Sequence, residues 1–176
     1  MADSFYWYDL ETTGTNPKWD RIVQFAGIRT DLHLNPIGEE LCFFVRLSDD
    51  VLPNPDASLV TGITPSKLAS DGISEFDALQ NILQEFNVPG TCALGYNSLR
   101  FDDEFMRYAL YRHLQDPYAR EYRNGNTRWD LVDLVRAAGA LRPEGIHWPT
   151  DENGQTVYRL EELTKANGID HGQAHD

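Results

Sequence analysis

Two acidic residues near the N-terminus have the type and spacing needed to hold a metal ion. Asp9 and Glu11 end a run of aromatic and apolar residues, in the segment DLETTG. Residues i and i+2 of a strand point to the same face, so the two carboxylates would project together and repel each other unless a cation neutralised them. The alternative is an acidic strand end that simply faces solvent, and the Asp-X-Glu pattern alone fits both.

A third carboxylate, Asp102, lies in the segment NSLRFDDEF, which follows a short apolar strand and begins a helix. We expect Asp102 to face the same ion site. Acidic residues are also favoured in the first turn of any helix by its dipole, and Asn97 or Ser98 could cap that helix. Asp102, Asp103 and Glu104 can therefore be explained without a metal.

Histidines near the C-terminus supply a candidate general base. His171 and His175 lie in the segment NGIDHGQAHD, and an imidazole with a pKa of about 6.5 can take a proton from water near neutral pH. A lone histidine in a terminal segment is more often exposed and idle. Oxygen ligands without cysteine suit Mg²⁺ or Mn²⁺ rather than Zn²⁺.

The surrounding elements form a pattern of strands followed by alternating helices and strands. Strand patterns cover residues 5–10, 21–34, 40–47 and 92–94, and helical spacing covers residues 76–86, 101–114, 131–138 and 160–166. The proline-rich stretch at Pro53 and Pro55 is predicted to be a loop. This order predicts an α/β fold in one domain, residues 1–176, with a mixed sheet of about five strands flanked by helices.

The charge of the chain, −13 overall, opposes binding to phosphate. Its basic residues are concentrated, however, because residues 100–142 hold 8 basic and 7 acidic side chains and the rest hold 7 and 21. No apolar run approaches the ~20 residues that span a bilayer, and no signal-peptide pattern is present. With Cys42 and Cys92 far apart and read as free thiols, the composition predicts a cytoplasmic protein that does not enter membranes.

The order of these segments resembles the DnaQ-like 3′→5′ exonuclease superfamily, in the DEDDh branch that uses a histidine and has a ribonuclease-H-like fold. DLETTG followed by DRIVQFA resembles the first motif of that superfamily, TGITP the link after it, and NSLRFD the second motif. YNSLRFDDEF, RWDLVDLVRA, LRPEGIHWP and LEELTKANGI are similar to the bacterial members that degrade single-stranded DNA. The resemblance covers nearly the whole chain.

The resemblance implies an exodeoxyribonuclease that hydrolyses single-stranded DNA to 5′-mononucleotides by two-metal catalysis. Asp9, Glu11 and Asp102 are implied to hold two Mg²⁺ ions, with Mn²⁺ as a substitute, and His175 to act as general base. Two other readings fit the same carboxylates: another enzyme of the superfamily, such as an oligoribonuclease or a polymerase proofreading subunit, or an inactive nucleic-acid-binding module.

The fourth carboxylate of the superfamily follows the histidine by five positions, which places it at position 180, past the end of this chain at Asp176. We therefore expect a chain truncated just before that carboxylate and lacking C-terminal domains. A rival register takes His171 as base and Asp176 as ligand, with the same spacing. The gap-free match of NGIDHGQAHD to the family favours His175.

Basic and aromatic residues interleave between positions 107 and 136, as in grooves that bind single strands without sequence preference. The resemblance implies that Leu10 and Thr12 contact the terminal nucleotide and that Arg159 contacts a phosphate near the cleavage site. The residues implied to lie along the DNA are Arg107, Tyr118, Tyr122 and Arg136. In the alternative, the arginines pair with nearby acidic residues and Trp129 is core. Partners are expected to be single-stranded DNA and, through the missing domains, single-stranded-DNA-binding protein.

Overall fold

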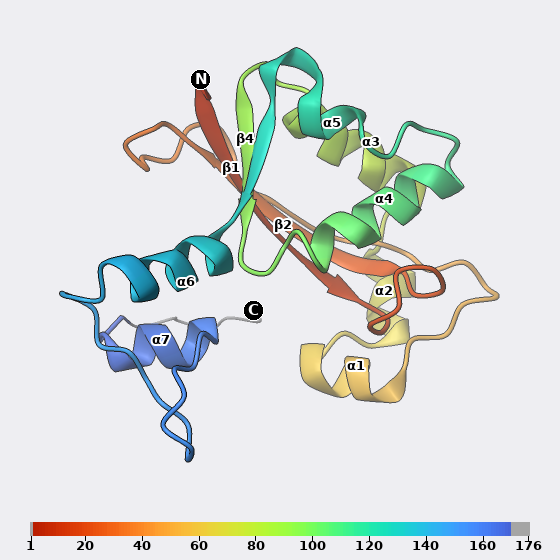
Figure 1. The fold of residues 1–176 in the computed structure, drawn as a ribbon. Helices are drawn as coiled ribbons and strands as arrows, with labels where there is room; N and C mark the ends of the chain where they lie inside the picture. Colours follow the sequence, from red (N-terminus) through yellow and green to blue (C-terminus); the bar gives the residue numbers. More distant parts are fainter. Residues whose placement is uncertain (1, 170–176) are drawn as a thin grey trace. The chain divides into compact units, whose positions relative to one another are not determined.

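The computed structural model describes residues 2–169. Contacts between residues divide the chain into two compact units, one ending at Trp129 and the other beginning at Asp130. A five-stranded mixed sheet in the order β3-β2-β1-β4-β5 runs through the fold (Figure 1). Its strands are β1 Ser4–Thr12, β2 Ile22–Thr30, β3 Leu41–Phe44, β4 Thr91–Gly95 and β5 Thr127–Asp130. The predicted α/β fold with a mixed five-stranded sheet and flanking helices is confirmed.

The central strand β1 pairs antiparallel with β2 along its length and parallel with β4 over a shorter stretch. The register with β4 joins residues 4–7 to residues 91–94. The last five residues of β1, from Tyr8 to Thr12, therefore lie beyond the stretch that pairs with β4. This overhang is the part of the sheet that carries the first acidic pair.

Alternating side chains of β1 divide the sheet into two unlike faces. Tyr6, Tyr8 and Leu10 are buried in one core cluster with Phe25 of β2 and with apolar residues of α3 and α4. The residues between them are half-buried or exposed. One face of β1 is therefore committed to the core, which leaves the other for chemistry.

Helices α3 and α4 contact each other and pack on the core face of the sheet (Figure 1). The helices of the first unit are α1 Pro55–Thr61, α2 Pro65–Asp71, α3 Glu75–Phe86, α4 Asp102–Arg112 and α5 Ala119–Tyr122, with a 3₁₀ turn at Arg123–Gly125. The loop predicted around Pro55 was wrong, because this proline begins α1. Asn54 caps that helix, and proline is favoured in a first helical turn, where its missing N–H has no partner to lose.

The second unit consists of α6 Leu131–Leu141, a long connection and α7 Leu160–Ala166. Gly139 of α6 lies so close to Tyr158 and Trp148 that an added Cβ would meet the Tyr158 hydroxyl at 3.2 Å. Asn167 fastens the connection to α7 by two hydrogen bonds of 2.9 Å with the backbone of His147. Across residues 2–169, the helices are all too short or too polar to cross a membrane.

An ion-pair cluster ties the beginning of α3 to the end of α4. Glu75 accepts a hydrogen bond of 2.6 Å from Arg112 and lies 2.9 Å from the Nε2 of His113. Burial raises the pKa of Glu75, but the hydrogen bonds and charges of Arg112 and His113 outweigh it and hold that pKa below its ordinary value of 4.5. The ionised carboxylate therefore favours the folded state.

We expect Glu75→Gln to destabilise the protein by about 2 kcal/mol near neutral pH, because two charge-assisted partners lose their carboxylate. A carboxylate with a lowered folded-state pKa stabilises above its unfolded pKa and loses that effect as the pH falls through the folded pKa. Urea unfolding of both proteins should therefore converge below pH 4.5. Asp71→Asn, at an exposed carboxylate on α2, is the matched control; a difference independent of pH would contradict the ion-pair account.

Candidate active site

Asp9 and Glu11 project from the face of β1 that the core does not use. Their neighbours Tyr8, Leu10 and Thr12 are buried, whereas Asp9 is exposed and Glu11 is half-buried. The strand geometry therefore gives the two carboxylates a common direction, as the i, i+2 spacing predicts. Both belong to the overhang of β1 beyond its pairing with β4.

Asp102 reaches this overhang from the first residue of α4. Its Oδ1 accepts a hydrogen bond of 3.0 Å from the backbone N–H of Leu10. Since Leu10 lies between Asp9 and Glu11, this bond brings the third carboxylate to the acidic pair. Asp102 thus accepts the hydrogen bond from β1 that a backbone carbonyl of a longer β4 would accept.

The environment of Asp102 strongly disfavours a negative charge. Burial is the larger cause and the nearby charge of Asp9 the second, and together they raise its pKa to about 8. Backbone hydrogen bonds, including the one from Leu10, oppose this rise without cancelling it. A buried carboxylate beside another anion is the electrostatic signature of a site that a cation would stabilise.

The turn that delivers Asp102 is not capped as expected. Neither Asn97 nor Ser98 caps α4; Phe101 occupies the N-cap position without a side-chain hydrogen bond. Asn97 has φ of 62°, and the buried Ser98 packs so closely on Gly95 that an added Cβ there would lie 2.6 Å from the serine Cβ. The turn is therefore shaped by close packing and by a left-handed residue rather than by capping.

Asp103, next to Asp102 in sequence, has different partners inside the protein. It accepts a hydrogen bond of 2.6 Å from the Tyr8 hydroxyl and forms ion pairs with Arg120 and Arg128. Burial opposes its ionisation, but Arg120 above all holds the pKa of Asp103 below its ordinary value. Its exposed fraction is 0%. The sequence analysis chose Asp102 for the ion site but gave Asp103 no role of its own, and the ~100° per residue of a helix is the signal that the two side chains could not both face one site.

The loop after β1 is held by Asp20. Its carboxylate accepts hydrogen bonds from the Thr13 hydroxyl at 2.9 Å and from the Asn16 backbone at 2.8 Å. It also lies against Gly14, where an added Cβ would be only 2.5 Å from Oδ2. Glycine in DLETTG is therefore needed for the close approach of Asp20, which fixes the chain just past Glu11.

Two predicted substrate residues of β1 have buried side chains. The Leu10 side chain belongs to the core cluster, and its backbone N–H is occupied by Asp102. The Thr12 hydroxyl donates to the Gly14 carbonyl at 2.6 Å. His175 and the rival pair His171 and Asp176 lie outside the described residues.

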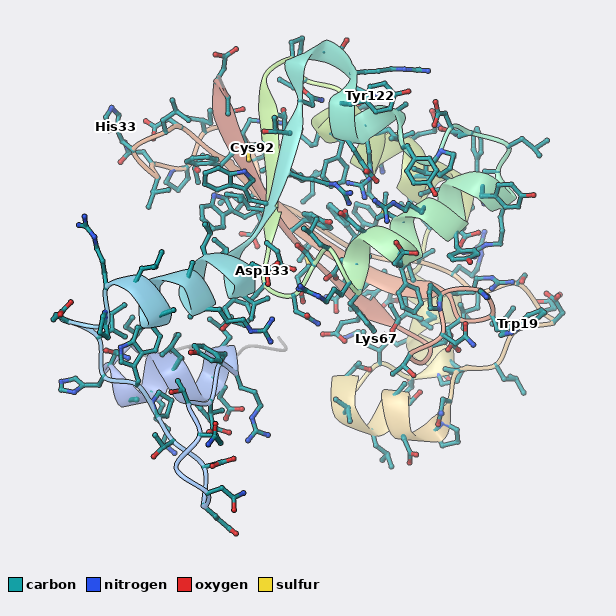
Figure 2. All side chains as sticks on the ribbon, viewed as in Figure 1. Trp19, His33, Lys67, Cys92, Tyr122 and Asp133 are labelled. Carbon is teal, nitrogen blue, oxygen red and sulfur yellow. The ribbon has the colours of Figure 1, made fainter. Side chains whose placement is uncertain are left out.

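Among the residues implied to lie along DNA, Tyr118 and Tyr122 are 53% and 60% exposed at the two ends of α5 (Figure 2 labels Tyr122). Arg107 lies 5.0 Å from the Tyr118 ring and forms a two-bond ion pair with Glu121, with N–O distances of 2.8 and 2.9 Å. It also pairs with Glu104. The guanidinium group that would meet a phosphate therefore already holds carboxylates.

The remaining two residues implied to contact DNA belong to the second unit. Arg136 lies 5.9 Å from the Tyr158 ring and 3.4 Å from Asp133, and Arg159 pairs with Glu162 at 2.5 Å. Trp129, proposed as core in the alternative reading, is 56% exposed. The expected pairing of arginines with neighbouring acids describes this segment well, whereas burial of Trp129 was wrong.

No complete metal centre is formed within residues 2–169, since no three His, Cys, Asp or Glu side chains close around one point. The donor types nevertheless fit a hard cation, because Asp9, Glu11 and Asp102, together called the acidic group, offer only oxygen atoms. The pKa of Asp102, raised by burial and by the charge of Asp9, means that a nearby cation would stabilise its ionised form.

The chain belongs to the exonuclease family, whose model matches residues 6–176. Exonucleases of this family generally use divalent metal ions.

Within the family, the chain is 54% identical to exodeoxyribonuclease I of Haemophilus influenzae over 173 residues, which cover 98% of this chain and 37% of that protein. A structure of Escherichia coli exonuclease I with a dA16 oligonucleotide matches with a TM-score of 0.95 and 51% identity, over 99% of this chain and 37% of that one. An ExoI/SSB-Ct complex matches with a TM-score of 0.95 and 50% identity, over 99% and 38% of the two chains. The chain thus spans little more than a third of these relatives.

We expect Asp102→Asn to stabilise the metal-free protein around pH 8, because it removes a buried charge yet keeps an acceptor for Leu10. For a group whose folded-state pKa is raised, the stability advantage is complete below the unfolded pKa and is lost as the pH rises through the folded value. Wild type should therefore lose stability between pH 3.8 and about 8 while the variant does not. Melting in EDTA should show the variant ahead by about 3 °C or more at the upper end; equal curves would contradict the burial of a charged Asp102.

Proposed function

We propose that this chain is the catalytic part of an exodeoxyribonuclease that removes 5′-mononucleotides from the 3′ end of single-stranded DNA. The observation that carries the proposal is the Asp102–Leu10 hydrogen bond, which brings a third carboxylate to the Asp9–Glu11 pair. Family membership and the likeness to exonuclease I, including its complex with an oligonucleotide, support the reaction and the substrate.

In this proposal Asp9, Glu11 and Asp102 hold two Mg²⁺ ions, with Mn²⁺ as a substitute. When bound, such ions lower the pKa of the attacking water and stabilise the leaving 3′-oxygen. His175 accepts the proton of that water as general base. A carboxylate at position 180, five residues after His175, is proposed to complete the ligand set of the exonuclease domain to which residues 1–176 belong.

The substrate strand is proposed to run along Tyr118 and Tyr122, whose exposed rings can stack on bases, with Arg107 beside them. Arg136 and Arg159 are proposed to hold phosphates, and residues 10 and 12 to contact the terminal nucleotide. Because the Leu10 and Thr12 side chains are buried, that contact is made through the surface of the β1 backbone.

The longer protein is proposed to bind single-stranded-DNA-binding protein through a part that follows this chain, as the ExoI/SSB-Ct complex suggests. A cytoplasmic location is proposed from the two cysteines, Cys42 and Cys92, both of which are free thiols.

The first prediction of this proposal is metal-dependent release of 5′-mononucleotides from single-stranded DNA. We expect release with Mg²⁺ and none with EDTA, and a loss of about 10³-fold or more in Asp9→Ala and in Asp102→Asn, because each removes a metal ligand. A longer version that includes position 180 should exceed this chain in activity. Asp20→Asn is the control, because Asp20 holds the loop after β1 and is not one of the three proposed ligands. It measures how much activity is lost when only that loop is disturbed.

The same assay separates the rival functions. Faster cleavage of a matched RNA oligonucleotide would favour an oligoribonuclease. Binding of DNA with no release by either version would leave an inactive binding module and contradict the proposed catalysis.

A further prediction concerns the aromatic residues along the strand. Tyr118→Ala and Tyr122→Ala should each weaken binding of a dT oligonucleotide about 5- to 100-fold, since stacking contributes roughly 1–3 kcal/mol per base. Tyr111→Ala is the matched control, because Tyr111 is also exposed but lies on α4 and has no proposed contact. Fluorescence anisotropy in EDTA measures the affinity without cleavage, and an equal loss in all three variants would contradict the proposed path.

A further inference from the structure

A cavity of about 320 Å³ lies in the first unit, away from the acidic group. The beginning of α3 and the end of α4 line it with Glu75, Phe76 and His113, and the segments next to β2 and β3 line it with Arg21 and Arg46. Its apolar wall includes Ile22 and Val45, which belong to the core cluster.

The sheet separates this cavity from Asp9 and Glu11, and Asp102 lies at the opposite end of α4 from the cavity-lining His113. Ile22 and Val45 pack in the same cluster as Tyr8 and Leu10, on the core face of β1. Asp9 and Glu11 alternate with those residues and project from the other face. A ligand in the cavity would therefore occupy a site different from the place where cleavage is proposed.

The two arginines of the cavity differ from most others in this acidic chain. Arg29 pairs with Glu85 and Arg123 with Asp116, as is usual here. In the part of the chain that the structure describes, neither Arg21 nor Arg46 pairs with a carboxylate; Arg21 donates only to the backbone carbonyls of residues 19 and 20, at 2.5 and 3.2 Å. Two guanidinium groups thus retain their capacity to hold an anion.

The acidic groups near the cavity already have hydrogen-bond partners of their own. Glu75 lines the cavity, but its carboxylate is already engaged by Arg112 and His113. The exposed Asp50 is close enough for its charge to interact with that of Arg21, and it accepts a hydrogen bond from Ser48. Asp77 lies beside the cavity as well, and its carboxylate accepts a hydrogen bond of 2.6 Å from the cavity-lining Ser74. Arg21 and Arg46 are thus cationic groups of the cavity that form no ion pair within the described residues, on a chain with a net charge of −13.

The size and rim of the cavity favour an organic phosphate over a bare anion. A volume of 320 Å³ falls within the roughly 300–1,000 Å³ of sites for small organic ligands, and far exceeds what one phosphate group fills. The Phe76 ring is 51% exposed and lies 6.0 Å from the His113 ring, so it offers an aromatic face on which a planar base can stack.

We propose that this cavity binds a nucleoside 5′-monophosphate, with the phosphate held between Arg21 and Arg46 and the base against Phe76. The proposal rests on the charge and shape of the cavity, so it holds whether or not the chain cleaves DNA.

The test is isothermal titration calorimetry of this chain with dAMP in EDTA, which removes metal-dependent binding at the acidic group. Millimolar or tighter binding is expected, with Arg46→Gln weakening it about tenfold or more through the loss of a charge-assisted contact. Arg142→Gln, at an exposed arginine of the second unit, should leave the affinity unchanged. Asp9→Ala should also bind normally, which keeps this result separate from the proposed nuclease activity.

Three further ligands decide what the cavity recognises. Deoxyadenosine should bind at least tenfold more weakly than dAMP, because the two arginines would lack their phosphate. Inorganic phosphate binding as tightly as dAMP would overturn the nucleotide assignment. A dT oligonucleotide that displaces dAMP would show instead that this surface holds the DNA strand. Unchanged NMR signals of the His113 and Phe76 rings on dAMP addition would overturn the proposal outright.

Discussion

The hydrogen bond between the Leu10 amide and the Asp102 carboxylate is the contact on which the candidate site depends. The pairing between β4 and β1 ends at Trp7. The backbone N–H of Leu10, beyond that point, needs another acceptor because buried backbone groups are rarely left unpaired. The carboxylate of Asp102, the first residue of α4, is that acceptor. The same bond fixes the carboxylate beside Asp9, where its charge is disfavoured. One hydrogen bond thus satisfies the Leu10 N–H and also brings Asp102 to Asp9 and Glu11.

Asp103 helps to hold Asp102 in place, because it attaches the same turn of α4 to β1. Its carboxylate is bound by Tyr8 of β1 and by two arginines, Arg120 and Arg128, so the first turn of α4 is attached to the strand at successive residues. Tyr8 and Leu10 are two residues apart and contact Asp103 and Asp102 respectively. A fully buried ion pair contributes little net stability, but it strongly constrains geometry.

Local patterns in the sequence were sufficient for the first four strands and for the direction of the acidic pair. The period of two puts Asp9 and Glu11 on one face whatever surrounds them. By contrast, the different roles of Asp102 and Asp103 depend on partners far away in the chain, such as Arg120. A local sequence pattern does not include such distant partners. β5 was missed for a similar reason: at four residues it is too short to show a period, and its pairing with β4 defines it. The choice of two metal ions, of His175 as the base and of a fourth carboxylate at position 180 rests on family resemblance.

The contacts of the arginines show how the net charge of −13 affects binding to phosphate. Arg107, within the basic segment, already holds Glu121 in a two-bond pair, so a phosphate that reached it would replace one anion by another. Such an exchange yields much less free energy than pairing with an unoccupied arginine, because the carboxylate must be released into water. Favourable contact with a strand would then depend mainly on aromatic surface, which Tyr118 and Tyr122 expose. Stacking does not distinguish one base from another, so the strand binding proposed for this chain would be independent of base sequence despite its acidity.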